Sequence, residues 1–256
     1  MGQQSIPAAR SMWLLLVTAT VLTSVVLNGC GSGSHALRVF VASSLTEVAQ
    51  HLAEEYETRY PNTDVELNIA GSGALVMQMQ EGAEADVVIL ASNSHMDRLR
   101  ELGVVLGSKG IARNSLAVIV SPQLAESINS VDDLRHRDLQ IAVCVKSSPC
   151  GALAFAYASS VGLNLASATR ESNVKAVLAK VERDEVDVGI VYMSDVRSSR
   201  AQLGHLETAG ADQYSTSYPL AVTADSKNKQ KAQDFVALFT DEVGQSTLTR
   251  FGFQLP

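Results

Sequence analysis

Four short segments place serines, glycines and backbone N–H groups where helices would begin after buried strands. They are residues 40–47, 70–75, 147–151 and 171–174. The first N–H groups of a helix have no partner inside the helix, and the helix dipole favours negative charge there. Lysine and arginine are nearly absent from these segments. They therefore predict that oriented, uncharged donors bind a doubly charged anion and select it by cavity size.

A structural interpretation stands beside the binding one at each segment. Ser44 with Glu47 fits the S-x-x-E capping box, with which many helices begin. Gly71 and Gly73 are also typical of a tight turn. Tyr192 ends a predicted strand, and periodicity alone assigns its side chain to the core, with the hydroxyl at the rim. A helix cap and a ligand contact can coexist at one serine, so both interpretations stay open.

No catalytic arrangement accompanies these serines. Ser72 lies between two glycines rather than in a G-x-S-x-G elbow, and no histidine has an evident pairing with Ser44 or Ser72. The histidines, which occur in polar or helical contexts, are His35, His51, His95, His136 and His205. No two histidines or carboxylates show the spacing of metal ligands on one helical turn. We expect no enzyme activity, no cofactor and no resident metal, and an exported serine hydrolase is the less favoured alternative.

The segments follow apolar runs that alternate with amphipathic stretches. The predicted strands are residues 37–42, 65–70, 86–91, 116–120, 139–145, 186–192 and 219–223. Apolar residues recur at helical spacing between them, as in residues 45–56 and 174–181. Strands buried on both faces with helices between them predict an α/β protein with largely parallel sheets. In such sheets a ligand lies at the carboxyl ends of the strands, where the four segments fall.

The composition is that of a globular protein and argues against a nucleic-acid partner. Of the 256 residues, 46% are hydrophobic and 18% are charged, and the formal net charge is -7. These values are ordinary for a soluble globular chain, long enough for one large domain or two modest lobes. No basic stripe is present, and an aromatic content of 5% leaves little surface for stacking bases.

The N-terminal residues 1–29 predict an export signal. Arg10 is the only charged residue before an uncharged run from Met12 to Leu27, which is shorter than the ~20 residues of a membrane-crossing helix. The end of this run resembles a bacterial lipobox, which implies that Cys30 is lipidated and anchors the protein to the outer face of the cell membrane. Residues 30–36 would then form the lipidated cysteine and a flexible tether. A plain signal peptide cut elsewhere is the alternative.

Two further cysteines, Cys144 and Cys150, have five residues between them. An exported protein folds in an oxidising compartment, so these thiols could close a small loop. A zinc site would need more ligands than these two. Spacing alone does not show whether the Cα atoms come within ~7 Å of each other. A disulfide and two free buried cysteines therefore both remain open.

Six motifs, in order along the chain, resemble the molybdate-binding proteins of bacterial ABC importers. They are residues 39–46, 70–75, 81–87, 181–185, 189–195 and 250–253. The resemblance extends from about Leu37 to Phe253, so it covers nearly the whole chain after the predicted signal. It implies a two-lobed type II periplasmic-binding-protein fold that closes like a flytrap. Lobe 1 would comprise residues 37–115 plus 220–256 and lobe 2 residues 116–219, with crossings near Ser115 and Tyr218.

The same resemblance implies which residues contact the oxyanion through its oxygens. Ser44 and Ser72 would bind through hydroxyl and backbone amide, Cys150 and Val174 through backbone amides, and Tyr192 through its hydroxyl. Cys150 stands where the family often has alanine. Because a main-chain amide does the binding at that position, the change of side chain leaves the predicted contact possible.

The resulting functional hypothesis is an extracytoplasmic lipoprotein that captures molybdate or tungstate and passes it to an ABC transporter permease with its ATPase. Its membrane contact would be the lipid anchor only, and we expect a monomer. A binding protein for another oxyanion, such as sulfate or phosphate, is the main alternative, because fold and export would be identical. A purely structural surface lipoprotein would leave the four similar helix starts unexplained.

Overall fold

The computed structural model describes residues 1–2, 36–208, 210 and 213–256. Residues 3–29 of the predicted signal peptide, Cys30 and the tether up to residue 35 lie outside the described residues, as does His35. The chain from residue 35 to residue 256 forms one compact unit. No helix among the described residues has both the length and the apolar character needed to cross a membrane.

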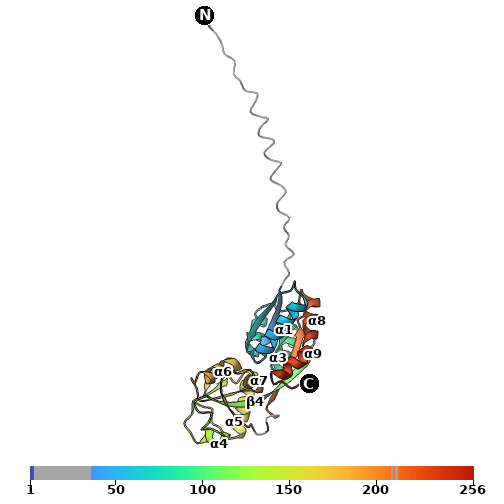
Figure 1. Ribbon diagram of the computed structural model, residues 1–256. Helices are drawn as coiled ribbons and strands as arrows, with labels where there is room; N and C mark the ends of the chain where they lie inside the picture. Colours follow the sequence, from blue (N-terminus) through green and yellow to red (C-terminus); the bar gives the residue numbers. More distant parts are fainter. Residues whose placement is uncertain (3–35, 209, 211–212) are drawn as a thin grey trace. The chain divides into compact units, whose positions relative to one another are not determined.

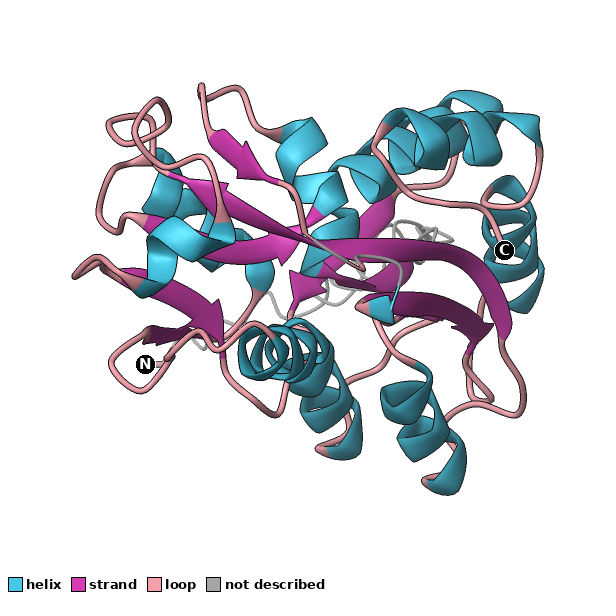
Figure 2. Cartoon of the chain, turned by 90° about the horizontal axis from the view of Figure 1, so that it is seen from below, coloured by secondary structure: helices cyan, strands magenta, loops and turns pink. Residues whose placement is uncertain are grey.

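Nine strands of the described residues form one mixed sheet in the order β2-β1-β3-β9-β4-β7-β5-β6, with β8 paired to β4. The strands are β1 (Leu37–Ala42), β2 (Val65–Ala70), β3 (Val87–Ile89), β4 (Lys109–Val120), β5 (Ile141–Cys144), β6 (Thr169–Glu171), β7 (Val188–Tyr192), β8 (Gly204–Leu206) and β9 (Ser215–Val222). Figure 2 shows helices on both faces of this sheet. Accordingly, the central strands β3, β5 and β7 consist entirely of buried residues.

The strand pairings change direction in the middle of the sheet. β1 pairs in parallel with β2 and β3, and β5 pairs in parallel with β6 and β7. Every pairing that involves β4 or β9 is antiparallel. The sheet is therefore less parallel than the apolar runs predicted, because β4 and β9 pair with each other through the centre of the unit.

The helices divide into two groups along the sheet, as Figure 1 shows. The short 3-10 helix η1 (Ser43–Leu45) and α1 (Thr46–Arg59), α2 (Ser72–Gln80), α3 (Asn93–Glu101), α8 (Lys229–Leu238) and α9 (Glu242–Arg250) belong with β1, β2 and β3. The helices α4 (Val131–Arg135), α5 (Pro149–Ser160), α6 (Val174–Glu182) and α7 (Met193–Ser198) belong with β5 to β8. We call these two groups the β1 half and the β5 half.

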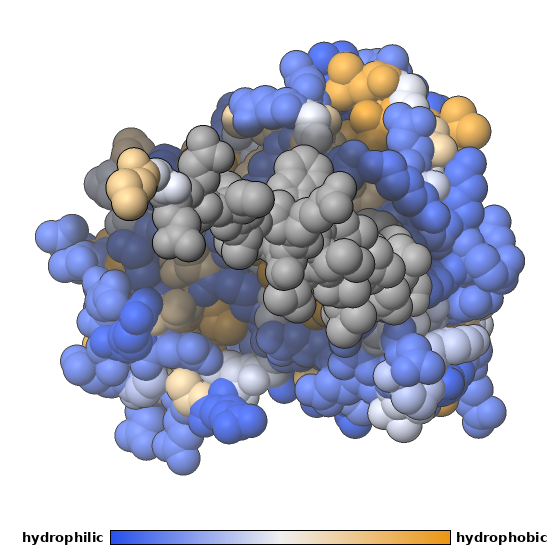
Figure 3. Space-filling view, turned by 90° about the horizontal axis from the view of Figure 1, so that it is seen from above, coloured by the Kyte–Doolittle hydropathy of each residue, from blue (hydrophilic) through white to orange (hydrophobic). Residues whose placement is uncertain are grey.

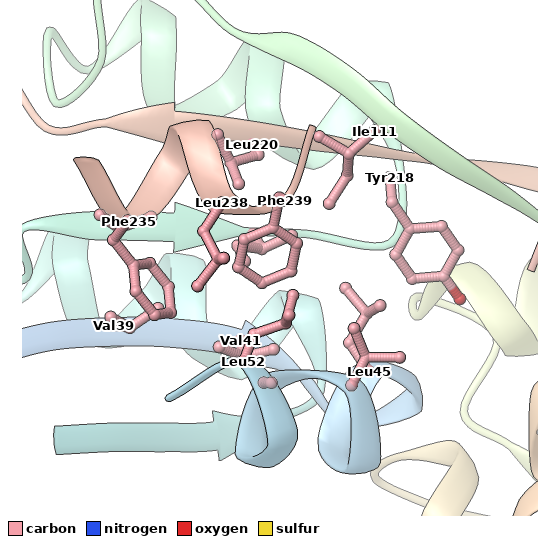
Figure 4. Packing of buried hydrophobic residues seen from close by; sticks show 14 of the residues in the cluster. Val39, Val41, Leu45, Leu52, Ile111, Tyr218, Leu220, Phe235, Leu238 and Phe239 are labelled. Atoms are coloured by element: carbon pink, nitrogen blue, oxygen red, sulfur yellow. The ribbon is translucent and has the colours of Figure 1, made fainter. Parts of the chain in front are cut away.

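Each half has its own hydrophobic cores. In the β1 half, side chains of β1 and α1 pack against Phe235, Leu238 and Phe239 (Figure 4). In the β5 half, Tyr157 of α5 packs with apolar residues of β4 and β7, and α6 covers the opposite face of these strands. Most side chains on the face shown in Figure 3 are hydrophilic, which agrees with apolar residues being buried inside each half.

β4 is common to both halves. Its residues up to Ser115 pair with β9, and its residues from Leu116 onwards pair with β7. This change of partner falls at the predicted crossing near Ser115, and Tyr218 lies within β9, which runs alongside. The division into lobes of residues 37–115 plus 220–256 and 116–219 stays a prediction, because residues 35–256 form one compact unit.

Candidate functional site

One small pocket lies where strands of both halves end and the following helices begin. Its empty volume is about 250 Å³, part of which is open to solvent. The lining residues are Ala42, Ser43, Ser44, Gly71, Ser72, Ala91, Ser148, Pro149, Cys150, Ser172, Asn173, Val174 and Tyr192. All five residues that the sequence predicted as ligand contacts are among them. No lysine, arginine, aspartate or glutamate belongs to this lining as far as the chain is described.

The β1 half contributes two buried serines. The Ser44 Oγ lies 2.7 Å from the hydroxyl of Tyr218, and the Ser72 Oγ accepts a hydrogen bond from the backbone N–H of Ala91 at 3.0 Å. The predicted capping box at Ser44 is wrong, because α1 has Leu45 at its N-cap and no side chain caps it. Ser44 instead lies within η1, and its hydroxyl is hydrogen-bonded to Tyr218 on the distant strand β9.

The β5 half contributes the N-termini of α5 and α6. Ser148 caps α5 by accepting from the N–H of Gly151 at 3.1 Å, and Asn173 caps α6 by accepting from the N–H of Ala176 at 3.1 Å. The cap of α5 is bonded to the N–H of Gly151, which follows Cys150, and the cap of α6 is bonded to the N–H of Ala176, two residues after Val174. A first-turn N–H has no acceptor within its own helix. The amides of Cys150 and Val174 are therefore suited to an anion in the pocket.

Tyr192 ends β7 and is fully buried, with its hydroxyl lacking any hydrogen-bond partner among the described residues. Burial raises the pKa of this tyrosine well above 10, and Tyr218 and Asp195 raise it further. The hydroxyl therefore keeps its proton at any physiological pH. A buried, unpaired hydroxyl is costly unless something supplies an acceptor, and here it belongs to a residue of the pocket lining.

A lysine stands directly beside the pocket lining, but its charge is neutralised by other groups. The Lys175 ammonium lies 2.7 Å from Glu47 Oε1 and 3.2 Å from Asp195 Oδ1. Burial by itself would lower the pKa of Lys175, but the two carboxylates outweigh this effect and raise it overall. Asp195 also accepts a hydrogen bond from the backbone N–H of Tyr192 at 3.0 Å. The pocket thus remains a site of uncharged donors.

Cys144 and Cys150 are joined by a disulfide, with their Cα atoms 5.9 Å apart. The bond ties the end of β5 to the first turn of α5, where Cys150 lines the pocket. A Cβ on Gly151 would lie 2.0 Å from the carbonyl oxygen of Val145, so this turn packs too closely for any residue but glycine. The disulfide and Gly151 together hold the N-terminus of α5 against β5.

Histidines and clusters of potential metal ligands are absent from the described lining of the pocket. None of the four histidines in the described part of the chain lines it, and no group of three His, Cys, Asp or Glu side chains there is placed to hold a metal ion. The residues that sequence reasoning missed are Tyr218 and Asn114, which lie behind Ser44. Both are fully buried polar side chains on strands. Asn114 stands between Arg113 and Ser115, outside the apolar run that predicted a strand, so the sequence offered no indication that it is buried.

A family model described as "Bacterial extracellular solute-binding protein" matches residues 37–254. The chain belongs to this family. It is accordingly an exported solute-binding protein and not an enzyme. Among its relatives, the molybdate-binding protein ModA of Mycobacterium tuberculosis strain H37Rv is 29% identical over 259 residues, which cover 95% of this chain and 99% of the relative.

Solved structures of similar proteins share this fold. The periplasmic molybdate-binding protein of Azotobacter vinelandii aligns with a TM-score of 0.77 and 19% identity, over 86% of this chain and 99% of that chain. The sulfate-binding protein SubI of Mycobacterium tuberculosis aligns with a TM-score of 0.73 and 16% identity, over 86% of each chain. The predicted α/β fold of the periplasmic binding proteins is confirmed for this solute-binding protein.

Proposed function

We propose that this solute-binding protein captures molybdate or tungstate in the pocket between its two halves and delivers the ion to the permease of an ABC importer. The observation that carries the proposal is the buried hydroxyl of Tyr192, which has no acceptor of its own among the described residues and belongs to a pocket whose other polar side chains are uncharged. A tetrahedral oxyanion supplies acceptors in several directions at once. It would give this hydroxyl the partner it lacks.

The charge of the ligand follows from the type of donor. Helix N-termini and hydroxyls stabilise negative charge, whereas a cation in this pocket would find no carboxylate in the described lining. Arginine is also absent from the described lining, which argues against an organic acid held by a bidentate ion pair. The name of the relative from Mycobacterium tuberculosis supports molybdate within the class of oxyanions.

Capture would involve both halves, because each contributes donors to the pocket. Ser44 and Ser72 come from the β1 half, and Cys150, Val174 and Tyr192 from the β5 half. An anion that bonds to both halves favours the closed arrangement in proportion to its difference in affinity for the closed and open states. The closed protein, which we expect to be a monomer without a cofactor, would then present its surface to the permease and its ATPase.

Attachment to the membrane is part of the same proposal. The lipobox-like sequence before Cys30 supports a lipid anchor on the outer face of the cell membrane. Metabolic labelling with a radioactive fatty acid should label the wild-type protein and leave the Cys30→Ser variant unlabelled. Equal labelling of both proteins would contradict the anchor without affecting the assignment of the pocket.

Isothermal titration calorimetry with molybdate, tungstate, sulfate and phosphate tests the ligand. We expect molybdate and tungstate to bind more tightly than sulfate and phosphate, because a smaller tetrahedron leaves donors of the pocket unpaired. Equal affinities for all four ions would refute the selectivity, and the absence of heat with any of them would refute oxyanion capture.

The variant Tyr192→Phe tests the pocket itself. Loss of a hydrogen bond to a charged ligand should weaken molybdate binding by about tenfold or more, while the unliganded protein should be no less stable because an unpaired buried hydroxyl has been removed. Tyr157→Phe is the matched control, since Tyr157 is equally buried in the β5 half but does not line the pocket. Equal effects of the two variants on affinity would contradict the proposed site.

A further inference from the structure

A buried chain of hydrogen bonds connects the pocket to the strands β4 and β9. It runs from Ser194 at the start of α7 through Asn114 of β4 and Tyr218 of β9 to Ser44 in the pocket. Ser44 and Ser194 are 2% exposed, and Asn114 and Tyr218 are completely buried. The contacts of Asn114 can be assigned from a group that only donates, and the contact between Ser44 and Tyr218, two hydroxyls, is then assigned from the cost of a buried hydroxyl hydrogen without an acceptor.

The orientation of the Asn114 amide follows from its contacts with Ser194. The backbone N–H of Ser194 can only donate, and the atom of Asn114 that faces it, at 3.4 Å, is therefore the oxygen Oδ1. The NH₂ group then lies 2.8 Å from Ser194 Oγ and 3.3 Å from the hydroxyl of Tyr218. Because an amide NH₂ has no acceptor capacity, both of these hydroxyl oxygens accept from it.

The orientation of the Tyr218 hydroxyl follows in turn. Figure 4 shows this hydroxyl pointing away from the apolar side chains of the β1 half. Its oxygen accepts from Asn114. Ser44 Oγ, at 2.7 Å, is the acceptor within reach of its hydrogen, and the opposite direction would leave that buried hydrogen unpaired, so we assign Tyr218 as the donor. Burial raises the pKa of Tyr218, so this hydrogen stays in place at physiological pH. The Ser44 oxygen is therefore occupied as an acceptor, and the Ser44 hydrogen is left for the pocket.

We propose that Asn114 is a positioning residue which, acting through the hydroxyl of Tyr218, orients the hydroxyl hydrogen of Ser44 into the ligand pocket. The inference rests on the proposed function in that it assigns Ser44 as a donor to an oxyanion. Asn114 itself does not line the pocket. Its effect is to prepare a donor before the ligand arrives, so binding does not require the reorientation of a hydroxyl that prefers another partner.

The variant Asn114→Asp tests this orientation, since it replaces the NH₂ group with an acceptor of nearly the same shape. The carboxylate would take the hydrogen of Tyr218, and the Tyr218 oxygen would then accept from Ser44 and draw its hydrogen out of the pocket. Because a new negative charge near the pocket also repels an anion, the variant is combined with Tyr218→Phe, which keeps the charge but cuts the chain. Asn68→Asp, on β2 outside the pocket, controls for charge at a distance.

We expect Asn114→Asp to weaken molybdate binding by about tenfold more in the wild-type background than in the Tyr218→Phe background, a coupling typical of residues in one hydrogen-bond network. Equal losses in both backgrounds would show that the new charge acts directly, and would overturn the inference.

Infrared spectroscopy of the unliganded wild-type protein provides a second test that needs neither ligand nor a folded Asn114 variant. The C–O stretching band of a tyrosine reports whether its phenol donates or accepts a hydrogen bond, and subtraction of the Tyr218→Phe spectrum isolates the band of Tyr218. A band typical of a phenol that both donates and accepts is expected. A phenol that only accepts would overturn the inference, whereas failure of the wild-type protein to bind molybdate would refute the proposed function alone.

Discussion

The side chains that line the pocket are uncharged, and several of them have an identified hydrogen-bonding role. Ser148 and Asn173 cap helices, Ser72 accepts from the backbone of Ala91, and Tyr192 has no partner among the described residues. Ser44 was the residue for which a helix cap and a ligand contact both remained open. The cap is now excluded, because the hydroxyl of Ser44 bonds to Tyr218, 174 positions further along the chain.

Gly71 provides a test of how closely the two halves must approach each other. A Cβ at this position would lie 2.7 Å from the carbonyl oxygen of Ser172 in the other half, although the backbone angles of Gly71 suit any residue. We expect Gly71→Ala to weaken molybdate binding by about tenfold or more, because the added methyl group opposes closure over the ligand. Calorimetry would measure the affinity.

Gly107→Ala is the control for this variant, since a Cβ there meets nothing within 4 Å. Thermal unfolding of the unliganded proteins should differ little between the two variants. An unchanged affinity in Gly71→Ala would show that the observed approach of Gly71 to Ser172 is not needed for binding.

His95 provides a prediction for acid conditions. Burial lowers the pKa of His95 below its ordinary value of 6.5, so the unfolded chain takes up a proton at a higher pH than the folded protein does. The free energy of unfolding should therefore fall as the pH drops through 6.5 towards the lower pKa of the folded state. Urea unfolding at a series of pH values should show a smaller fall in the free energy of unfolding for His95→Asn than for the wild type. Parallel curves of this free energy against pH for variant and wild type would contradict the prediction. His136→Asn, at an exposed position, is the control.

At the scale of elements, the ends of the strands decide where the donors lie. Strands β1 and β2 have the bounds that their short apolar runs predicted, and α6 begins at the predicted Val174. The three-residue strands β6 and β8 were not predicted, because so short a run has no periodicity of its own. β4 begins at Lys109 rather than at residue 116, since its first part is held by pairing with β9 instead of by an apolar pattern.

The disulfide provides a prediction about the β5–α5 connection. Replacing both Cys144 and Cys150 with alanine removes the covalent tie between the end of β5 and the first turn of α5, in which Cys150 lines the pocket. We expect the free energy of unfolding to fall by about 2 kcal/mol, as for a short closed loop, and the affinity for molybdate to fall as well, because the first turn of α5 is less firmly held. Chemical denaturation and calorimetry measure the two effects.

The Gly244→Ala variant provides a control for a loss of stability away from the pocket, because a Cβ there would lie 2.1 Å from the carbonyl oxygen of Leu238 in the β1 half. A loss of stability without any loss of affinity in the double cysteine variant would show that the disulfide supports the fold but does not position the amide of Cys150.

At the scale of the whole folded unit, an ion pair joins the two halves beside the pocket. Lys175 of α6 in the β5 half contacts Glu47 of α1 in the β1 half, and within its own half it contacts Asp195. This arrangement accounts for a lysine next to a pocket whose described lining carries no charge. The charge of Lys175 is shared between two carboxylates, so it is not free to act as a fixed counter-ion in the pocket.

The ion pair yields a prediction about closure. Glu47→Gln removes the charge that the β1 half contributes, while Asp195 remains as the partner of Lys175. We expect molybdate binding to weaken by about threefold, in line with a partly exposed ion pair, and the remaining difference from wild type to shrink at high salt. Calorimetry at two ionic strengths measures both effects.

Glu84→Gln is the matched control, because the Glu84–Lys227 pair is exposed and lies within the β1 half. A tighter affinity in Glu47→Gln would mean that the carboxylate repels the ligand more than it stabilises the closed arrangement.

Local properties of the sequence determined the α/β class, the presence of helix starts at the four segments 40–47, 70–75, 147–151 and 171–174, and the uncharged character of their side chains, because propensity, periodicity and helix-terminus chemistry depend on neighbours a few positions apart. Two cysteines in one segment also raised the disulfide as an open alternative. The tertiary structure alone decided that the five candidate residues line one pocket, that Ser44 bonds to Tyr218 rather than capping α1, and that Glu47 and Asp195 neutralise Lys175. These contacts join residues far apart in the chain, and only the path of β4 and β9 through both halves brings them together.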